Sequence, residues 1–211
     1  MAYDIEQQES LSAMKAWFEA YGNWIIGAAL VVILAVSGNW AWNWYQTRES
    51  AAAATLFEQY QQAVVGKDAA KARELAGSLV QQYGSSTYAA LAALVQARAS
   101  LEAGDATACK AQLHWVIDKS GNAEMGALAR VRLAGVLLDE KAYDEGLAIL
   151  AGDAPAALAA QFSDRRGDLL LAQGKSADAR AAYTRALEQA TAQSPLRALV
   201  QSKLDALPAA S

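Results

Sequence analysis

The chain has 211 residues, of which 54% are hydrophobic and 19% charged, and its formal net charge is −4. This acidic balance excludes the basic surface that nucleic-acid binding requires, so we expect no nucleic acid among the partners. The single cysteine, Cys109, excludes an intramolecular disulfide and a metal site built from several cysteines.

An acidic tail over residues 1–20 precedes a long run without charge. No Lys, Arg, Asp or Glu occurs in the 28 positions between Glu19 and Arg48. Because a bilayer core about 30 Å thick needs roughly 20 apolar residues as helix, we predict a transmembrane helix over 21–46. Aromatic rings, which favour the headgroup layer, stand at both ends of the run. The predicted belts are Trp17, Tyr21 and Trp24 at one end and Trp40, Trp42, Trp44 and Tyr45 at the other.

Two other interpretations of this run fit less well. A cleaved secretory signal would have a shorter apolar core, a basic start and small residues at its cleavage point. A buried soluble helix would not need aromatic residues at both ends. The direction of the span stays open, because Lys15 and the amino terminus flank one end and Arg48 flanks the other, so positive charge does not decide it.

One face of the predicted transmembrane helix carries small residues near both ends. Gly27, Val31, Leu34 and Gly38 follow one another at helical spacing. Small residues let a second helix approach closely, so this strip is a candidate helix–helix face. Contact with lipid is the alternative, since glycine is common in membrane helices.

The rest of the chain, residues 47–208, is predicted to be all-helical. It is rich in Ala, Leu, Gln and Glu and has few β-branched runs. Turn-forming residues interrupt it, and each break can end one helix or cap the next. The helices between them would have about a dozen to eighteen residues, as in an array of paired antiparallel helices. The breaks fall at 66–68, 84–86, 104–105, 120–122, 140–142, 152–155, 174–176 and 194–195.

The clearest repeat unit is RRGDLLLAQGKSADARAAYTRALEQ, residues 165–189. It resembles a tetratricopeptide repeat, with Gly167 at the small position of the first helix and Gly174 in the turn. On the second helix, Tyr183 would fill the gap beside the small residues.

Small residues recur at the place that Ala179 occupies in this unit. Earlier equivalents are Gly146, Cys109 and Ala72, at spacings of 33, 37 and 37 residues. Tetratricopeptide units run 34 residues, so we predict an array whose first two units are less regular than the last two.

The two ends of the array are predicted to differ from its repeats. No strong helix breaker separates Trp44 from Val65, so we predict that the transmembrane helix continues into the first helix of the domain. A closing helix is predicted over 194–207. Its inward stripe would comprise Leu196, Leu199, Val200, Leu204 and Leu207.

Reactive side chains are scarce. One histidine and one cysteine cannot build a protease triad or a zinc enzyme, and His114 is expected to be a structural residue with a satisfied ring. The GKS at 174–176 ends like a phosphate loop, but Leu169 stands where that motif needs glycine. We predict that the protein is not an enzyme and has no catalytic residue, cofactor or metal.

The candidate functional surface is the inner face of the array, made by the first helix of each pair. This strip mixes apolar and charged residues, which suits adaptable contacts with peptide segments or a partner domain. The alternative is that these residues pack against neighbouring helices. The predicted groove positions are Leu94, Arg98 and Leu101, then Val131, Gly135 and Leu138, then Asp164, Asp168 and Leu171.

The order of these parts is similar to the YfgM family, the ancillary subunits of the bacterial Sec translocon. The resemblance covers nearly the whole chain. It rests on the acidic tail, the anchor and the stretches YAALAALVQARASLEAGDATACKAQLHWVI, ARVRLAGVLLDEKAYDEGLAIL, RRGDLLLAQGKSADARAAYTRALEQ and SPLRALVQSKLDALP. It implies a single-pass protein of the bacterial inner membrane, with a cytoplasmic N-terminus and a periplasmic tetratricopeptide-like domain.

The resemblance also implies partners, which are the Sec channel, a membrane-anchored periplasmic chaperone of the prolyl-isomerase type, and unfolded exported proteins. No catalytic residue carries over from it. We expect weak groove contacts to act at high effective concentration, because the anchor would confine the domain beside the channel. The alternative function is a scaffold of another cell-envelope complex, for outer-membrane assembly or division, without contact to exported chains.

Overall fold

The computed structural model describes most of the chain, namely positions 24, 27, 30–34, 36–38, 40 and 49–207. Its contacts divide the chain into two units, Met1–Ser50 and Ala51–Ser211, which are described separately.

The predicted membrane segment falls partly outside this description. Its belt residues Trp17, Tyr21, Trp42, Trp44 and Tyr45 lie outside the described residues. Trp24, Trp40, Gly27, Val31, Leu34 and Gly38 are described and helical. In the part of the chain that was described, none of the helices is long and apolar enough to cross a bilayer. The predicted helix between Trp44 and Val65 also includes residues without a description, so its continuity stays a prediction.

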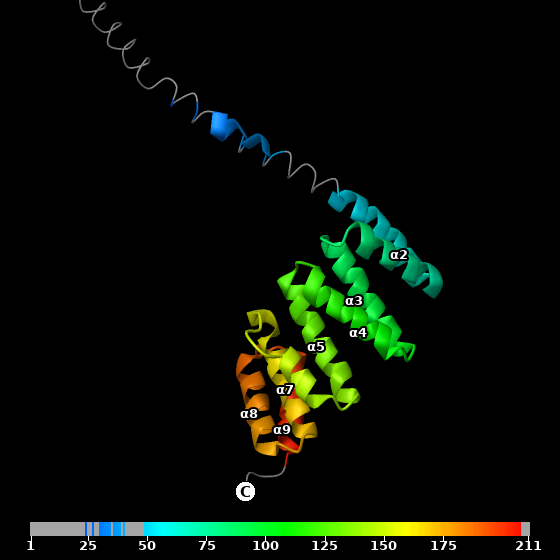
Figure 1. Ribbon diagram of the computed structural model, residues 1–211. Helices are drawn as coiled ribbons and strands as arrows, with labels where there is room; N and C mark the ends of the chain where they lie inside the picture. Colours follow the sequence, from blue (N-terminus) through cyan, green and yellow to red (C-terminus); the bar gives the residue numbers. More distant parts are fainter. Residues whose placement is uncertain are drawn as a thin grey trace, which may run out of the picture. The chain divides into compact units, whose positions relative to one another are not determined.

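The second unit is a stack of antiparallel helices in which each helix packs on the one before it (Figure 1). The pairs are residues 51–65 with α2 (Ala69–Gln82), α3 (Thr87–Glu102) with α4 (Ala106–Lys119), α5 (Ala123–Asp139) with α6 (Tyr143–Ile149), and α7 (Ala159–Ala172) with α8 (Ser176–Gln189). The 3₁₀ turn η1 (Ala156–Leu158) precedes α7, and α9 (Pro195–Asp205) closes the stack. The predicted all-helical array with a closing helix is therefore confirmed.

Side-chain caps start four of the described helices, each at a break that the sequence indicated. In each, a side-chain oxygen accepts a hydrogen bond of 2.9–3.2 Å from a backbone N–H three residues further on, which satisfies a donor that the helix leaves free. The capping residues are Asp68 for α2, Ser86 for α3, Asp105 for α4 and Asn122 for α5. Pro195 instead starts α9 from its first turn, where its missing N–H costs nothing.

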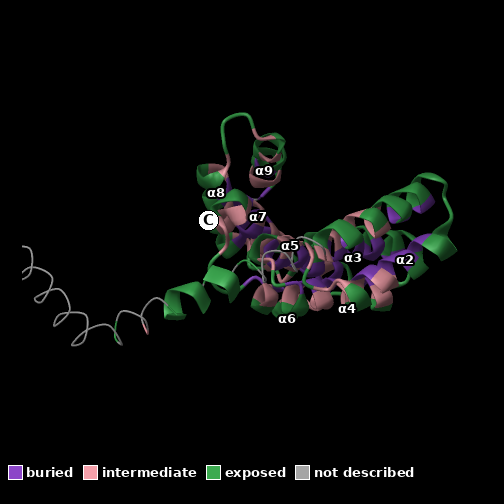
Figure 2. Cartoon of the chain, turned by 90° about the horizontal axis from the view of Figure 1, so that it is seen from above, coloured by how far each residue is buried: buried purple, intermediate pink, exposed green. Residues whose placement is uncertain are grey.

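The small residues of the predicted repeat all occupy the same place in the structure. Ala72, Cys109, Gly146 and Ala179 are each the fourth residue of the second helix of a pair, and all are buried. There they let paired helices approach closely. Residues are buried where the helices face one another and exposed on the outer surfaces (Figure 2). The buried clusters follow in chain order, each joining adjacent helices, as expected for a repeat stack.

The turn between the helices of each pair uses one residue with positive φ. Gly104 and Gly174 have φ of +80° and +77°, but Lys67 and Lys141 occupy the equivalent places with φ of +57° and +62°. A residue with a Cβ is strained in this left-handed conformation.

Lys141→Gly is expected to raise the free energy of unfolding by about 1 kcal/mol, because it removes that strain. Urea unfolding would measure the change. Lys175→Gly is the control, since Lys175 has φ of −85° and gains nothing from glycine. Equal effects of the two changes would contradict this account of the turn.

Two details of the predicted helices are wrong. The helix α6 has 7 residues, fewer than expected, because Gly152 and Pro155 keep the chain from continuing as helix. Arginine side chains from α5 and α7 bind the free carbonyls that follow α6, at Leu150, Ala151 and Asp153.

The closing helix α9 differs from the prediction at one position. Leu196, Val200 and Leu204 face the core at four-residue spacing, and Leu207 is also buried. Leu199 is 51% exposed, because it lies on a different face of the helix from that stripe.

Candidate functional site

The first helices of three successive pairs, α3, α5 and α7, contribute to one pocket of about 340 Å³ on the predicted inner face. Residues of α4 complete its apolar wall. We call it the arginine pocket, because Arg98, Arg132 and Arg165 line it together with Leu101, Leu113 and Val136. Asp139 is also among its lining residues. The pocket thus combines positive charge with an apolar wall.

Arg132 is the cation of this pocket that lacks a carboxylate. Arg98 binds Glu102 at 2.8 Å and Arg165 binds Asp168 at 3.2 Å. Arg132 Nη1 donates only to the Leu94 carbonyl, at 3.2 Å, and no carboxylate in the described part of the chain forms an ion pair with it. Burial, and then the charge of Arg98, lower the pKa of Arg132. An anionic group in the pocket would relieve that repulsion.

The predicted groove residues divide into three groups in the structure. Arg98, Leu101 and Gly135 line the arginine pocket. Leu94 is buried in the core, and Val131 and Leu138 pack against the next buried cluster.

The third group, from α7, has a different environment. Lys203 Nζ of α9 lies 2.7 Å from Asp164 Oδ1 and 2.7 Å from Asp168 Oδ1. The Tyr183 hydroxyl donates to Asp168 Oδ1 at 2.8 Å. Burial raises the pKa of Asp164, and the hydrogen bond from Lys203 partly offsets this. Leu171 is exposed. The two carboxylates are therefore held by α9, while Leu171 is free for contact.

The sequence analysis did not single out Arg132 and Arg165 as site residues. Each stands two positions before the small residue of a first helix, Ala134 or Gly167, so the repeat alignment could have placed both on one side of the stack.

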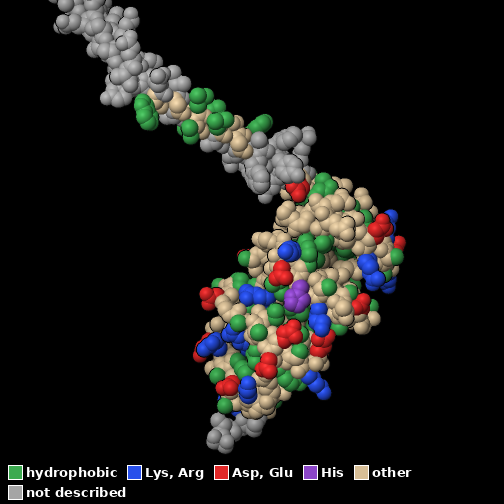
Figure 3. Space-filling model, in the orientation of Figure 1, with side chains coloured by type: hydrophobic (Ala, Val, Ile, Leu, Met, Phe, Trp, Pro, Cys, Tyr) green, Lys and Arg blue, Asp and Glu red, His purple; other side chains and the backbone are tan. Residues whose placement is uncertain are grey.

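The expectation for His114 is wrong in one respect. Its ring is half-buried and forms no hydrogen bond within the described residues, so solvent and not a protein partner is left to satisfy it. No group of three or more possible metal ligands occurs in the same described part of the chain. On the face seen in Figure 3, acidic and basic side chains are interspersed.

Comparison with known proteins places this architecture in a family. Residues 15–209 match the model of a family described as a tetratricopeptide repeat-like domain. Over 211 residues, the chain is 32% identical to a protein of Neisseria gonorrhoeae named ancillary SecYEG translocon subunit, and the match covers 98% of this chain and 100% of that relative. The chain belongs to the YfgM family.

Other YfgM relatives match across most of their length. The ancillary SecYEG translocon subunit of Haemophilus influenzae is 27% identical over 188 residues, covering 88% of this chain and 91% of the relative. That of Escherichia coli is 26% identical over 178 residues, covering 84% and 85%.

Proposed function

We propose that this protein is a membrane-anchored interaction protein, an ancillary subunit of the Sec translocon that links the channel to a periplasmic chaperone of the prolyl-isomerase type and assists exported proteins. The observation that carries the proposal is the match over the full length of a relative named ancillary SecYEG translocon subunit. The stack of helical pairs also supports it, because such arrays present extended surfaces that suit an interaction role.

The anchor in this proposal is the transmembrane helix over 21–46, with residues 1–20 in the bacterial cytoplasm and 47–208 in the periplasm. The 28 uncharged positions between Glu19 and Arg48 support it, because they suffice for a bilayer core. The strip of Gly27, Val31, Leu34 and Gly38 would contact a helix of the channel. The anchor would thereby hold the repeat domain at the membrane, beside the channel.

The arginine pocket is the part of the inner face that would contact exported chains. It offers an apolar wall, and Arg132 is free of any carboxylate within the described residues. One such contact is weak, of roughly millimolar affinity. Confinement beside the channel raises the effective concentration of an emerging chain to a similar level. Repeated weak contacts with an exported chain would then be sufficient, and no single high-affinity site is required.

Photocrosslinking in membranes that contain the translocon tests both contacts. A photoreactive residue at Leu34 should label the channel, and one at Leu101 should label exported chains and the chaperone. Val32 and Ala181 are the matched controls, because Val32 lies on the other side of the anchor helix and Ala181 is an exposed residue of α8. Labelling from each control should be about tenfold weaker than from its partner position.

The following results would contradict the proposal. Labelling of a single envelope protein that is neither channel, chaperone nor exported chain would support the scaffold function instead. Equal labelling from Leu34 and Val32 would contradict a specific face on the anchor, and equal labelling from Leu101 and Ala181 would contradict the inner-face site.

A further inference from the structure

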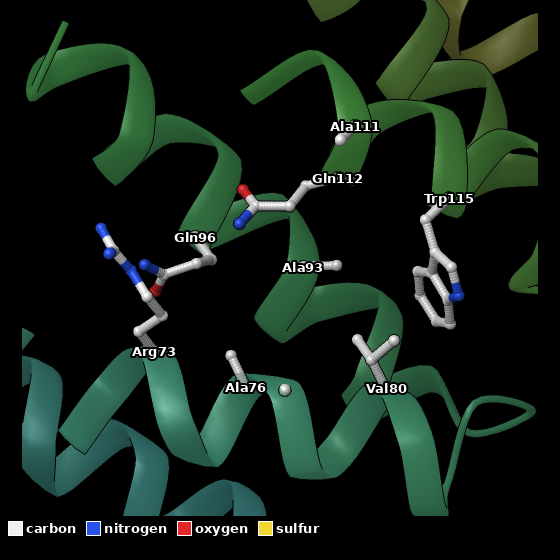
Figure 4. Close-up of a pocket in the computed structure, with 9 residues that line it drawn as sticks. Arg73, Ala76, Val80, Ala93, Gln96, Ala111, Gln112 and Trp115 are labelled. Carbon is white, nitrogen blue, oxygen red and sulfur yellow. The ribbon is translucent and has the colours of Figure 1, made fainter. Parts of the chain in front are cut away.

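A second pocket of about 310 Å³ lies between α2, α3 and α4, and the inner-face prediction did not include it (Figure 4). Its floor and one end are apolar, with Val80 from α2 and Trp115 from α4. Two glutamine side chains from different helices, Gln96 and Gln112, extend into the same space beside Arg73 (Figure 4). We call it the amide pocket, defined by Arg73, Gly77, Val80, Gln96, Gln112 and Trp115.

Neither glutamine side chain has a hydrogen-bond partner among the described residues, and the Oε1 atom of Gln112 is buried. Gln96 is only 7% exposed, and its amide forms no hydrogen bond within the described part of the chain. The Oε1 atom of Gln112 is buried and has no hydrogen-bond partner there either. Leaving a buried polar group unpaired is unfavourable. The pocket therefore holds donors and acceptors that a ligand could satisfy.

The chemistry of these groups indicates the ligand. A glutamine amide carries two N–H donors and a carbonyl with two lone pairs, which match the C=O and N–H of a peptide group. Helices and sheets already pair their own peptide groups, whereas an extended, unfolded segment leaves them free. None of the described residues that line the pocket carries a carboxylate, and Arg73 adds a further donor for carbonyl oxygens.

We propose that the amide pocket binds an extended segment of unfolded polypeptide, with its main chain on Gln96 and Gln112 and one apolar side chain on Val80 and Trp115. The volume lies at the lower end of the range for ligand sites, about 300–1,000 Å³, so it takes a short stretch of chain. Recognition through the main chain makes the site tolerant of sequence. This inference deepens the proposed assistance to exported proteins and rests on that part of it.

A substitution at Gly77 can test whether the amide pocket binds the peptide. A Cβ placed on Gly77 meets no atom within 4 Å, and the residue lines the pocket in the middle of α2. Gly77→Leu should therefore fill the pocket without disturbing the core, and it raises helix propensity. Ala70→Leu is the matched control, because Ala70 is an exposed residue of the same helix that does not line the pocket.

The binding experiment uses the full chain in lipid nanodiscs without any translocon. The probe is a capped, fluorescein-labelled nonapeptide of alanine and serine with a central leucine, followed by fluorescence anisotropy. The unchanged protein and Ala70→Leu should bind it equally, and Gly77→Leu about tenfold more weakly. A probe N-methylated on both sides of the leucine should lose about the same factor, whereas a probe with its alanines and serines reordered should bind unchanged.

Gln112→Met separates binding from folding. It removes the unpaired buried oxygen, so the thermal midpoint should rise while the probe binds several-fold more weakly. A residue with a structural role alone would not give these opposite changes.

Equal binding by Gly77→Leu and Ala70→Leu, or unchanged binding of the N-methylated probe, would overturn the proposal. So would a dimer that sedimentation detects and Gly77→Leu abolishes, because a second copy would then occupy the pocket. Because no translocon is present, failure here is distinct from failure of the crosslinks at Leu34 and Leu101.

Discussion

Gly167→Ala should lower the free energy of unfolding by about 3 kcal/mol, at the upper end of the usual effect of overpacking. A Cβ on Gly167 would lie 2.4 Å from Tyr183 Cε1, whereas carbon atoms pack at about 3.5–4.0 Å. The ring cannot retreat, because Tyr183 is 1% exposed and its hydroxyl is bound to Asp168. The helices α7 and α8 would have to separate. Urea unfolding of the full chain in detergent, followed by circular dichroism, measures the loss.

Gly77→Ala is the control for this change. It places the same methyl group in the middle of a helix, but in open space, and should stabilise the protein by about 0.5–1 kcal/mol. Adding Tyr183→Ala to Gly167→Ala should cost less than the sum of the two single changes, because the clashing ring is gone. Similar losses from Gly167→Ala and Gly77→Ala, or simple additivity in the double variant, would refute the packing argument.

Lys203→Met should lower the free energy of unfolding at neutral pH by about 3 kcal/mol, because it leaves two neighbouring carboxylates without their shared cation. The side chains of Asp164 and Asp168 are 10% and 14% exposed, so water screens them little. Arg98→Met is the control. Arg98 and its partner Glu102 form a pair whose side chains are 77% and 64% exposed, so the loss of this pair should leave the stability nearly unchanged.

The loss in Lys203→Met should depend on pH. The folded-state pKa of Asp164 is already raised by burial, and removing Lys203 raises it further. At pH values between the pKa of Asp164 in the unfolded chain and its higher pKa in the folded variant, the folded variant holds a proton that the unfolded chain has released. The free energy of unfolding of the variant therefore falls as pH rises through this interval. The loss of stability in Lys203→Met, relative to the unchanged protein, should therefore become smaller toward about pH 4.

The free energy of unfolding, measured at neutral pH and at about pH 4, tests this pH dependence. Adding Asp164→Asn to Lys203→Met should restore part of the stability at neutral pH, since it removes one of the two charges. The proposed role of Lys203 would be contradicted if Lys203→Met lost as much stability at about pH 4 as at neutral pH. It would also be contradicted if the double variant were no more stable than Lys203→Met.

Much of the fold was predictable because its signals are local and periodic. A cap such as Asp105 acts on a residue three positions away, and the small residues Cys109 and Ala179 repeat at nearly constant spacing. The short α6 was not predicted, because each arginine that binds the carbonyls after it lies at least sixteen residues away along the chain. Leu199 was misplaced because a leucine three residues after Leu196 fits an apolar stripe in the sequence but turns off the core face.

The sites were harder to predict than the fold. The inner face was located from the repeat, and three of its predicted positions line the arginine pocket. The role of Asp164 was not foreseen, because its partner Lys203 is 39 residues away. The amide pocket was missed because Gln96 and Gln112 look like ordinary helix residues, and only packing shows that Gln96 is buried and that Gln112 Oε1 has no partner among the described residues.

The serial arrangement of the buried clusters bears on how such proteins can evolve. Each cluster joins adjacent helices, and the turns at 67, 104, 141 and 174 are equivalent. An in-frame duplication or deletion that begins and ends at two of these turns would add or remove one hairpin and create one new junction, leaving the other interiors intact. Lineages could thereby change how far the stack extends in steps of one hairpin.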